Sequence, residues 1–260
     1  MNITISLCQT HTSKIKEECF KSTLKALKKA GTRKSDLVIL PEMWNSPYTP
    51  KYLKLNAEKE YGESYQLLKN AAKKYGYYLV GGSIPVIRNE KIYNTSYVFD
   101  REGNEIGATD KKHLFDVDLG GKYSIRESAT ISAGNGGLVV DTEFGKIGVA
   151  ICYDVRFPEY IKELTKKGAR IIALPAAFNL KTGPVHWELT ARGRAMDNQV
   201  YFAAVAPSRD QTLGYVTYGH SILVDPWGQT VGKLGYSNGV LTETVNLDYV
   251  DEVRRKLPIL

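Results

Sequence analysis

Three apolar segments of the chain end in residues that could contribute to a chemical site. Glu42 follows the run Leu-Val-Ile-Leu-Pro, Cys152 follows Ile-Gly-Val-Ala-Ile, and Phe178 follows Ile-Ile-Ala-Leu-Pro-Ala-Ala. Uninterrupted apolar runs of this kind are typical of strands buried on both faces. In α/β folds the active site lies beyond the carboxyl ends of the strands. The sequence therefore predicts that these segments converge on one site.

Cys152 is the candidate nucleophile. A thiol has an ordinary pKa of about 8.5, so it needs a base or a nearby cation to become strongly nucleophilic. Cys152 precedes Tyr153 and Asp154 at a predicted strand-to-helix turn, where backbone N–H groups can bind an oxyanion. A buried core cysteine is the alternative, and position alone does not choose between the two. Cys8 and Cys19 have no comparable context and are interpreted as core or partly exposed thiols.

Glu42 and one of two consecutive lysines are the candidate partners of the cysteine. A carboxylate at the end of a buried strand loses hydration, which raises its pKa towards that of a useful base; a solvent-facing loop carboxylate is the alternative. Lys111 and Lys112 precede the segment His-Leu-Phe-Asp. Successive strand residues point to opposite faces, so at most one of these lysines is expected in a pocket. There it would hold a thiolate and then the charge of a tetrahedral intermediate.

A cysteine–histidine hydrolase is the rival arrangement. None of the four histidines lies in a local motif that identifies a catalytic base, and we interpret them as structural. They are His11, His113, His186 and His220.

Length and composition indicate one globular domain over residues 1–260. The chain is 43% hydrophobic and 24% charged, and no linker or low-complexity segment divides it. Three cysteines are too few for a disulfide scaffold, and no pair has metal-ligand spacing. The N-terminus lacks the pattern of a signal peptide, and no apolar run approaches the ~20 residues that span a bilayer. A reduced, cytoplasmic setting without membrane contact is expected.

The net charge of +7 favours small anionic molecules over nucleic acid as partners. Six lysines between residues 14 and 29 fall along a predicted amphipathic helix. A solvated helix face explains them without a nucleic-acid surface. The apolar face of this helix is predicted to consist of Ile15, Phe20, Leu24 and Leu27.

Strand-like and helix-like segments alternate along the chain, which predicts an α/β fold. The two halves repeat a similar order, which suggests two sheets packed face to face with helices outside. Helices are predicted at 63–74, 157–167, 185–198 and 249–256. Hairpins are predicted from 94–100 with 105–109 and from 138–141 with 147–152.

Three segments in a fixed order resemble the motif regions of the nitrilase, or carbon–nitrogen hydrolase, superfamily. They are Leu-Pro-Glu-Met-Trp around Glu42, Asp-Lys-Lys-His-Leu-Phe-Asp around Lys111, and Gly-Val-Ala-Ile-Cys-Tyr-Asp-Val-Arg-Phe-Pro-Glu around Cys152. One such segment would be weak, whereas all three in this order are specific. The likeness covers most of the chain. It continues through Asn-Ser-Pro-Tyr at 45–48, Gly-Gly-Ser-Ile-Pro at 81–85 and the segment 178–201.

The resemblance implies a four-layer αββα sandwich, commonly assembled as dimers, and a Glu–Lys–Cys triad that needs no metal and no organic cofactor. The family's lysine lies two residues before the histidine of the His-Leu-Phe-Asp motif, which selects Lys111 over Lys112. A second glutamate of many family sites falls on Glu127. The implied reaction is amide hydrolysis through a thioester on Cys152. Lys111 and the backbone N–H of Tyr153 would hold the oxyanion.

Within this family the chain most resembles the omega-amidases, which hydrolyse the distal amide of 2-oxoglutaramate and of succinamate. Such substrates carry a carboxylate at the far end, which a cation that donates two parallel hydrogen bonds binds well. We assign this role to Arg156, with an ion pair to Glu159 or Asp154 as the structural alternative. The other residues expected to line the pocket are Tyr48, Phe178 and Thr182, with core packing as the alternative for Tyr48 and Phe178.

One residue departs from the family pattern. Asp110 stands where family members often carry arginine, which weakens the substrate assignment but leaves the triad intact. Alternatives within the family are an amidase for deaminated glutathione, a carbamoyl-amide hydrolase and a nitrilase. A catalytically silent binding protein on this fold is the alternative from another class, and the intact triad argues against it. The expected partners are a small anionic amide and a second copy of the chain.

Overall fold

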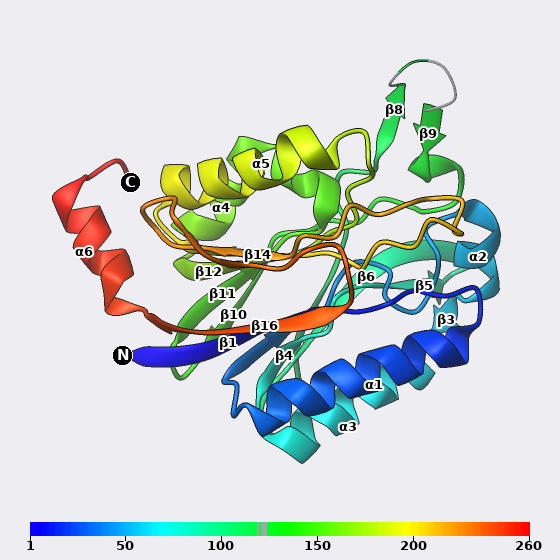
Figure 1. Ribbon diagram of the computed structural model, residues 1–260, viewed down its shortest axis with the longest axis horizontal. Coiled ribbons are helices and arrows are strands. Elements are labelled where there is room, and N and C mark those ends of the chain that lie inside the picture. The colour runs from blue at the N-terminus through cyan, green and yellow to red at the C-terminus, as the bar shows by residue number, and fades with distance from the viewer. Residues whose placement is uncertain (119, 121–123) are drawn as a thin grey trace.

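Two β-sheets pack face to face, and helices cover the outer surface of each (Figure 1). The computed structural model describes residues 1–118, 120 and 124–260. Four layers result, in the order helices, sheet, sheet, helices, as predicted. Their arrangement follows from the burial of apolar faces on both sides of each sheet.

The first sheet joins both ends of the chain. β1 pairs in parallel with β2 and antiparallel with β16 near the C-terminus. β7 forms an antiparallel hairpin with β6, which confirms the first predicted hairpin. In order across the sheet the strands are β16 (Gly239–Asn246), β1 (Asn2–Gln9), β2 (Leu37–Ile39), β4 (Tyr78–Val80), β6 (Lys91–Phe99), β5 (Ile84–Arg88) and β3 (Glu58–Lys59), with β7 (Glu105–Asp110) beside β6.

The second sheet has a parallel centre. β11, β12 and β13 run parallel, and antiparallel strands flank them. The strands in order are β10 (Leu138–Thr142), β11 (Gly145–Val149), β12 (Ala169–Pro175), β13 (Tyr201–Val205), β14 (Ile222–Val224) and β15 (Thr230–Lys233). A separate two-stranded ribbon consists of β8 (Asp116–Asp118) and β9 (Ser124–Arg126).

Two helices lie on each sheet, and two further helices lie beside these layers (Figure 1). α1 (Lys16–Thr32) and α3 (Glu63–Tyr75) cover the first sheet, and α4 (Pro158–Lys166) and α5 (Gly183–Asn198) cover the second. The remaining helices are α2 (Pro50–Leu55), α6 (Asp248–Lys256) and the 3₁₀ turns η1 (Glu127–Ala129) and η2 (Cys152–Arg156). None of the helices in the described part of the chain combines the length and the apolarity needed to cross a bilayer.

Alternate residues of the central strands enter different cores, which explains their uninterrupted apolar sequences. Leu37 and Ile39 of β2 lie between the sheets, whereas Val38 packs under α1 and α3. Likewise Ile171 of β12 lies between the sheets and Ile172 packs under α4 and α5. A strand with both faces covered has no polar side, so its period-two pattern disappears.

The predicted apolar face of α1 is wrong in part. Leu27 is fully buried, but Ile15 and Leu24 are 53% and 48% exposed. Ile15 precedes the helix, and Leu24 lies on its solvent side. The face that packs on the sheet carries smaller side chains, which a search for large apolar residues overlooks. These buried residues are Cys19, Thr23, Ala26, Leu27 and Ala30.

Candidate active site

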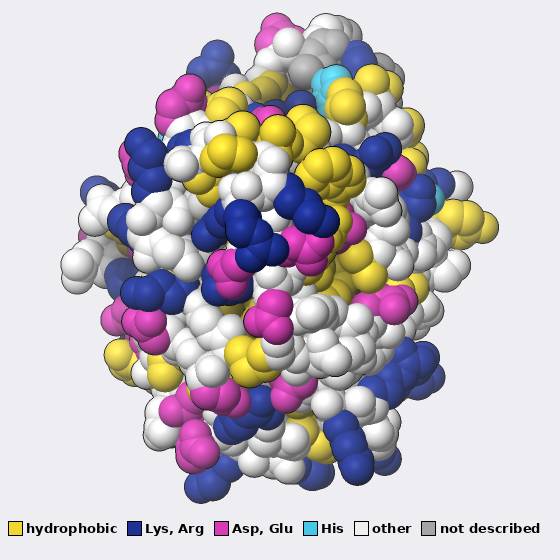
Figure 2. Space-filling model, turned by 90° about the vertical axis from the view of Figure 1, so that its left-hand side faces the viewer, with side chains coloured by type: hydrophobic (Ala, Val, Ile, Leu, Met, Phe, Trp, Pro, Cys, Tyr) yellow, Lys and Arg dark blue, Asp and Glu magenta, His cyan; other side chains and the backbone are white. Residues whose placement is uncertain are grey.

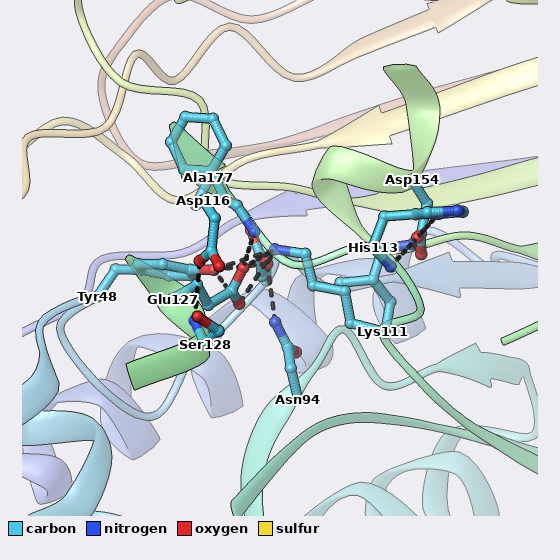
Figure 3. Close-up of polar contacts among 12 residues, drawn as sticks. Tyr48, Asn94, Lys111, His113, Asp116, Glu127, Ser128, Asp154 and Ala177 are labelled. Atoms are coloured by element: carbon cyan, nitrogen blue, oxygen red, sulfur yellow. Dashed lines mark hydrogen bonds and ion pairs between the residues drawn. The ribbon is translucent and has the colours of Figure 1, made fainter. Parts of the chain in front are cut away.

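Predicted site residues from both sheets meet in one buried cluster (Figure 3). Glu42 follows β2, and Lys111 directly follows β7. Glu127 begins η1, and Cys152 begins η2 after β11. The carboxyl ends of the strands thus converge as the sequence predicts.

Lys111 lies at the centre of the cluster, with its side chain fully buried. Its backbone N–H donates to the carbonyl of Asn94 at 2.9 Å, which continues the β6–β7 pairing past the last residue of β7. Nζ lies 3.0 Å from Glu42 Oε1, 2.8 Å from Glu127 Oε2 and 3.1 Å from the Tyr48 hydroxyl. Burial by itself would lower the pKa of Lys111, but the charges of Glu127 and Glu42 raise it well above its usual value. The ammonium form is therefore held between two carboxylates.

Lys112 faces solvent. It is exposed, and its Nζ lies 5.5 Å from the centroid of the Tyr160 ring. The chain thus directs one lysine inwards and its neighbour outwards just after β7 ends at Asp110.

Glu42 is fully buried, and one of its oxygens accepts three hydrogen bonds, the longest from the Tyr48 hydroxyl at 3.4 Å. Oε1 accepts from Lys111 Nζ and, at 2.8 Å, from Asn94 Nδ2. Among the described residues, no full hydrogen bond reaches Oε2. Burial raises the pKa of Glu42 above its ordinary 4.5, while Lys111 and the contact with the Cys152 thiol oppose the shift. The arrangement gives a poorly hydrated carboxylate with one oxygen available to take a proton.

Cys152 adopts a strained backbone conformation at the start of η2. Its φ is 47°, in the left-handed region that residues with a Cβ seldom occupy. Burial, followed by the charge of Glu42, raises the pKa of the thiol well above its ordinary value. The positive charge of Lys111 opposes this shift, as does the nearby backbone of Ala177. The resting sulfur is therefore a thiol that must lose its proton to react.

Asp154 connects the lysine loop with the cysteine turn. Oδ2 accepts from the backbone N–H of Ile151 at 3.0 Å, and Oδ1 accepts from the backbone N–H of His113 at 2.9 Å. His113 Nδ1 lies 2.8 Å from the same Oδ1, and its ring stacks on Phe157 with centroids 3.6 Å apart. These contacts give His113 a structural place beside the cluster. His113 makes no hydrogen bond to the cysteine among the described contacts.

Glu127 and Tyr48 close the far side of the cluster. The Tyr48 hydroxyl donates to Glu127 Oε1 at 2.5 Å, and Glu127 Oε2 accepts from the backbone N–H of Phe115 at 2.6 Å. Both oxygens of Glu127 also lie within hydrogen-bonding distance of Lys111 Nζ. Tyr48 thus contacts the charged cluster and is not plain core packing.

Tyr215 closes the space beside the thiol. Two cavities of about 10 Å³ each reach the cluster, one beside Tyr48 and the other beside Cys152 and Arg156, and Tyr215 lines both. The Tyr215 hydroxyl donates to the carbonyl of Ala177 at 2.6 Å, and its ring centroid lies 5.1 Å from that of Tyr48. Each cavity has about the space of one water molecule. Neither cavity has room in this conformation for a substrate with several carbon atoms.

Arg156, Phe178 and Thr182 line the cavity that contains the cysteine. The guanidinium carbon of Arg156 lies 4.9 Å from the centroid of the Phe178 ring. Neither of the carboxylates considered as structural partners binds Arg156. Asp154 is engaged by Ile151 and His113, and Glu159 is exposed.

The chain is similar to known proteins over nearly its whole length. The sequence pattern of the family described as carbon-nitrogen hydrolase matches residues 4–255. The chain belongs to the carbon–nitrogen hydrolase family. The omega-amidase NIT2 of Danio rerio is 44% identical and that of Homo sapiens 41%, each over 98% of this chain and 92% of the relative. The crystal structure of Nit3 from Saccharomyces cerevisiae, of the nitrilase superfamily, matches with a TM-score of 0.90 at 36% identity, covering 99% of this chain and 95% of that one.

In this carbon–nitrogen hydrolase, the unusual Asp110 is paired away from the cluster. Its carboxylate accepts from the Thr95 hydroxyl at 2.6 Å and forms an ion pair with Arg88. Arg88 in turn reaches Glu60 and stacks on the ring of Tyr93. The negative charge is therefore compensated by a neighbouring strand and does not face Lys111.

Several residues that shape the site of this hydrolase were not predicted. Asn94 is a fully buried amide of β6, followed by the equally buried Thr95 and Ser96, so its local sequence does not single it out. Asp154 was considered only as a partner of Arg156. Tyr215 lies in a loop and has no local signal, because only the folded chain brings it over the cysteine.

Proposed function

We propose that this hydrolase cleaves the distal amide of small dicarboxylate monoamides, such as 2-oxoglutaramate and succinamate, to the acid and ammonia. The observation that carries the proposal is the buried Glu42–Lys111 cluster beside Cys152, with Arg156 on the wall of the cavity that contains the thiol. The similarity to omega-amidases over nearly the whole chain supports the same substrate class.

The first half of the proposed reaction forms a thioester. Glu42 accepts the thiol proton as the Cys152 sulfur attacks the amide carbon. Lys111 and the backbone N–H of Tyr153 stabilise the oxyanion that develops. The proton on Glu42 then passes to the leaving nitrogen, the carbon–nitrogen bond breaks, and ammonia departs.

The second half restores the enzyme. Glu42 takes a proton from a water molecule, which attacks the thioester carbon. The carbon–sulfur bond breaks, the acid leaves, and the proton returns from Glu42 to the sulfur. Glu127 acts in both halves as a positioning residue, because it holds Lys111 opposite Glu42. A water-poor site strengthens each of these charge interactions.

The far end of the substrate defines the specificity. We assign the distal carboxylate to Arg156, whose guanidinium can form two parallel hydrogen bonds with it. Phe178 and Thr182 line the same cavity, and Tyr48 lines the adjoining one beside Glu42. The sibling amidases share the catalytic cluster, so only the pocket separates them from an omega-amidase.

The pH dependence of kcat/KM is expected to show the raised pKa of the buried Glu42. The base must be ionised in the free enzyme, and burial raises its pKa above 4.5. Acidification should therefore reduce kcat/KM with a midpoint above pH 4.5, since protonation of Glu42 removes the base. The measurement is kcat/KM against pH with an amide that has no ionisable group, beside a check that the enzyme stays folded. An acid midpoint at or below 4.5 would argue against Glu42 as a desolvated base.

A substrate panel tests the proposed function. Ammonia release is expected to be strong from 2-oxoglutaramate and succinamate, and at least about tenfold weaker from a nitrile, a carbamoyl amino acid and deaminated glutathione, because one well-placed charged contact contributes about that factor. Cys152→Ala serves as the control for contaminating activity. Turnover confined to another panel member would retain the catalytic cluster and discard the pocket assignment. No turnover of any member, together with slow alkylation of Cys152, would favour a silent binding protein.

We also propose that residues 1–260 form one domain, that two copies of the chain associate, and that the enzyme works in a reducing, cytoplasmic setting. The shared core between the sheets supports one domain. The three cysteines are free, which agrees with reducing conditions.

Figure 2 shows apolar side chains gathered on one face, among interspersed basic and acidic ones. Exposed apolar residues that could support association include Val185, Leu189 and Met196 of α5 and Leu257, Ile259 and Leu260 after α6.

A further inference from the structure

Arg156 carries a positive charge that no acidic side chain neutralises among the described residues. The side chain is partly buried, and burial lowers its pKa. Its contacts are with uncharged groups: the face of the Phe178 ring, 4.9 Å from the guanidinium carbon, and the imidazole of His186. A cation held in this way retains its attraction for an anion that enters the cavity.

The contact with His186 has a defined direction. An Nη atom of Arg156 lies 3.1 Å from His186 Nδ1. A guanidinium can only donate hydrogen bonds, so Nδ1 must present its lone pair, and the proton of a neutral imidazole must then be on Nε2. Burial and the nearby charge of Arg156 lower the pKa of His186, which favours the neutral ring.

The neutral imidazole of His186 leaves the charge of Arg156 intact, which a carboxylate in the same place would not. Either would fix the orientation of the guanidinium, but a carboxylate would also cancel its charge. His186 restrains one N–H group of Arg156 from the first turn of α5, where its own backbone N–H bonds to the carbonyl of Thr182. Among the residues that the structure describes, no other group accepts a hydrogen bond from this guanidinium, so its remaining N–H groups are left for a ligand.

We propose that His186 is a positioning residue that orients Arg156 and thereby determines the preference for amides with a distal carboxylate. The inference rests on the proposed function, since it concerns the same pocket. His186 acts through Arg156 and has no part in the chemistry at Cys152. Its loss should therefore affect the binding of charged substrates and leave the chemical step unchanged.

The test compares a charged and an uncharged amide of equal length, succinamate and butyramide. His186→Ala is expected to raise KM for succinamate about tenfold, the value of one hydrogen bond to a charged group, with little change in kcat. KM for butyramide should stay the same. In His186→Asn the amide oxygen can take the place of Nδ1, so this variant should recover most of the affinity for succinamate. Thr190→Ala, one turn further along α5, is the matched control and should behave as wild type.

A double-mutant cycle separates positioning from general damage to the helix. In an Arg156→Ala background, His186→Ala should add no further increase in KM for succinamate, because the residue that it orients is absent. Equal effects on both amides, additive effects in the cycle, or an unchanged KM in His186→Ala would overturn the inference alone. A wild-type enzyme without preference for succinamate over butyramide would overturn the proposed function and this inference with it.

Discussion

Cys152→Ala is expected to reduce amide hydrolysis by about 10⁶-fold, the loss seen when a covalent nucleophile is removed. The protein should fold as before, because alanine keeps the Cβ and can adopt the same backbone conformation, with φ at 47°. Removing the sulfur also removes a buried group that contacts Glu42. Steady-state ammonia release measures the loss of activity, and thermal unfolding of the same preparation shows whether the fold is retained.

Cys8→Ala is the matched control for this prediction. Cys8 is buried like Cys152, but it packs between the first sheet and its helices, away from the cluster. Its loss should lower the free energy of unfolding by about 1 kcal/mol and leave turnover unchanged.

Rapid quenching of the wild-type enzyme should in addition trap one acyl group on Cys152. Substantial turnover by Cys152→Ala, or an acyl group on another residue, would disprove the thioester mechanism.

Lys111→Ala is expected to damage both catalysis and stability. Losing one donor to the oxyanion costs about 10²–10³ in kcat. The same change leaves Glu42 and Glu127 buried without their cation, and breaking a buried pair in this way costs about 3–5 kcal/mol of folding free energy. Denaturant unfolding and kcat, measured on the same variant, test both parts.

Lys112→Ala provides the comparison within the same loop. Lys112 is exposed, so its removal should change stability by less than about 0.5 kcal/mol and leave kcat near the wild-type value. If Lys112→Ala were inactive and Lys111→Ala active, the assignment of the lysine would be wrong by one position. Should Lys111→Ala fail to fold, Lys111→Met, which keeps the length of the stem, allows the kinetic comparison.

The sequence located the proposed catalytic cluster in two steps, first from local patterns and then from a family resemblance. Apolar runs identified the strands that precede Glu42 and Cys152, and the alternation of strand residues limited the pocket to one lysine. These inferences succeed because strand burial and side-chain direction are local properties with a short repeat. The resemblance to the carbon–nitrogen hydrolases then selected Lys111 and added Glu127.

Local pattern failed where small residues or distant segments decide the packing. The buried face of α1 rests on Thr23, Ala26 and Ala30, so a search for large apolar side chains placed Leu24 on the wrong side. Helix burial depends on what the opposing sheet can accommodate, and small residues allow close approach.

Only the tertiary structure decided which groups surround the cluster. Asn94 reaches Glu42 from β6, Tyr215 covers the cavities from a loop, and His186 restrains Arg156 from α5. In the sequence none of the three carries a local pattern that predicts its contact, although His186 lies in the segment 178–201 that resembles the family. Their roles arise from contacts between segments far apart in the chain, which the packing of two sheets and their helices sets. The sequence by itself determined which groups we propose to react, and the fold determined their orientation and the space around them.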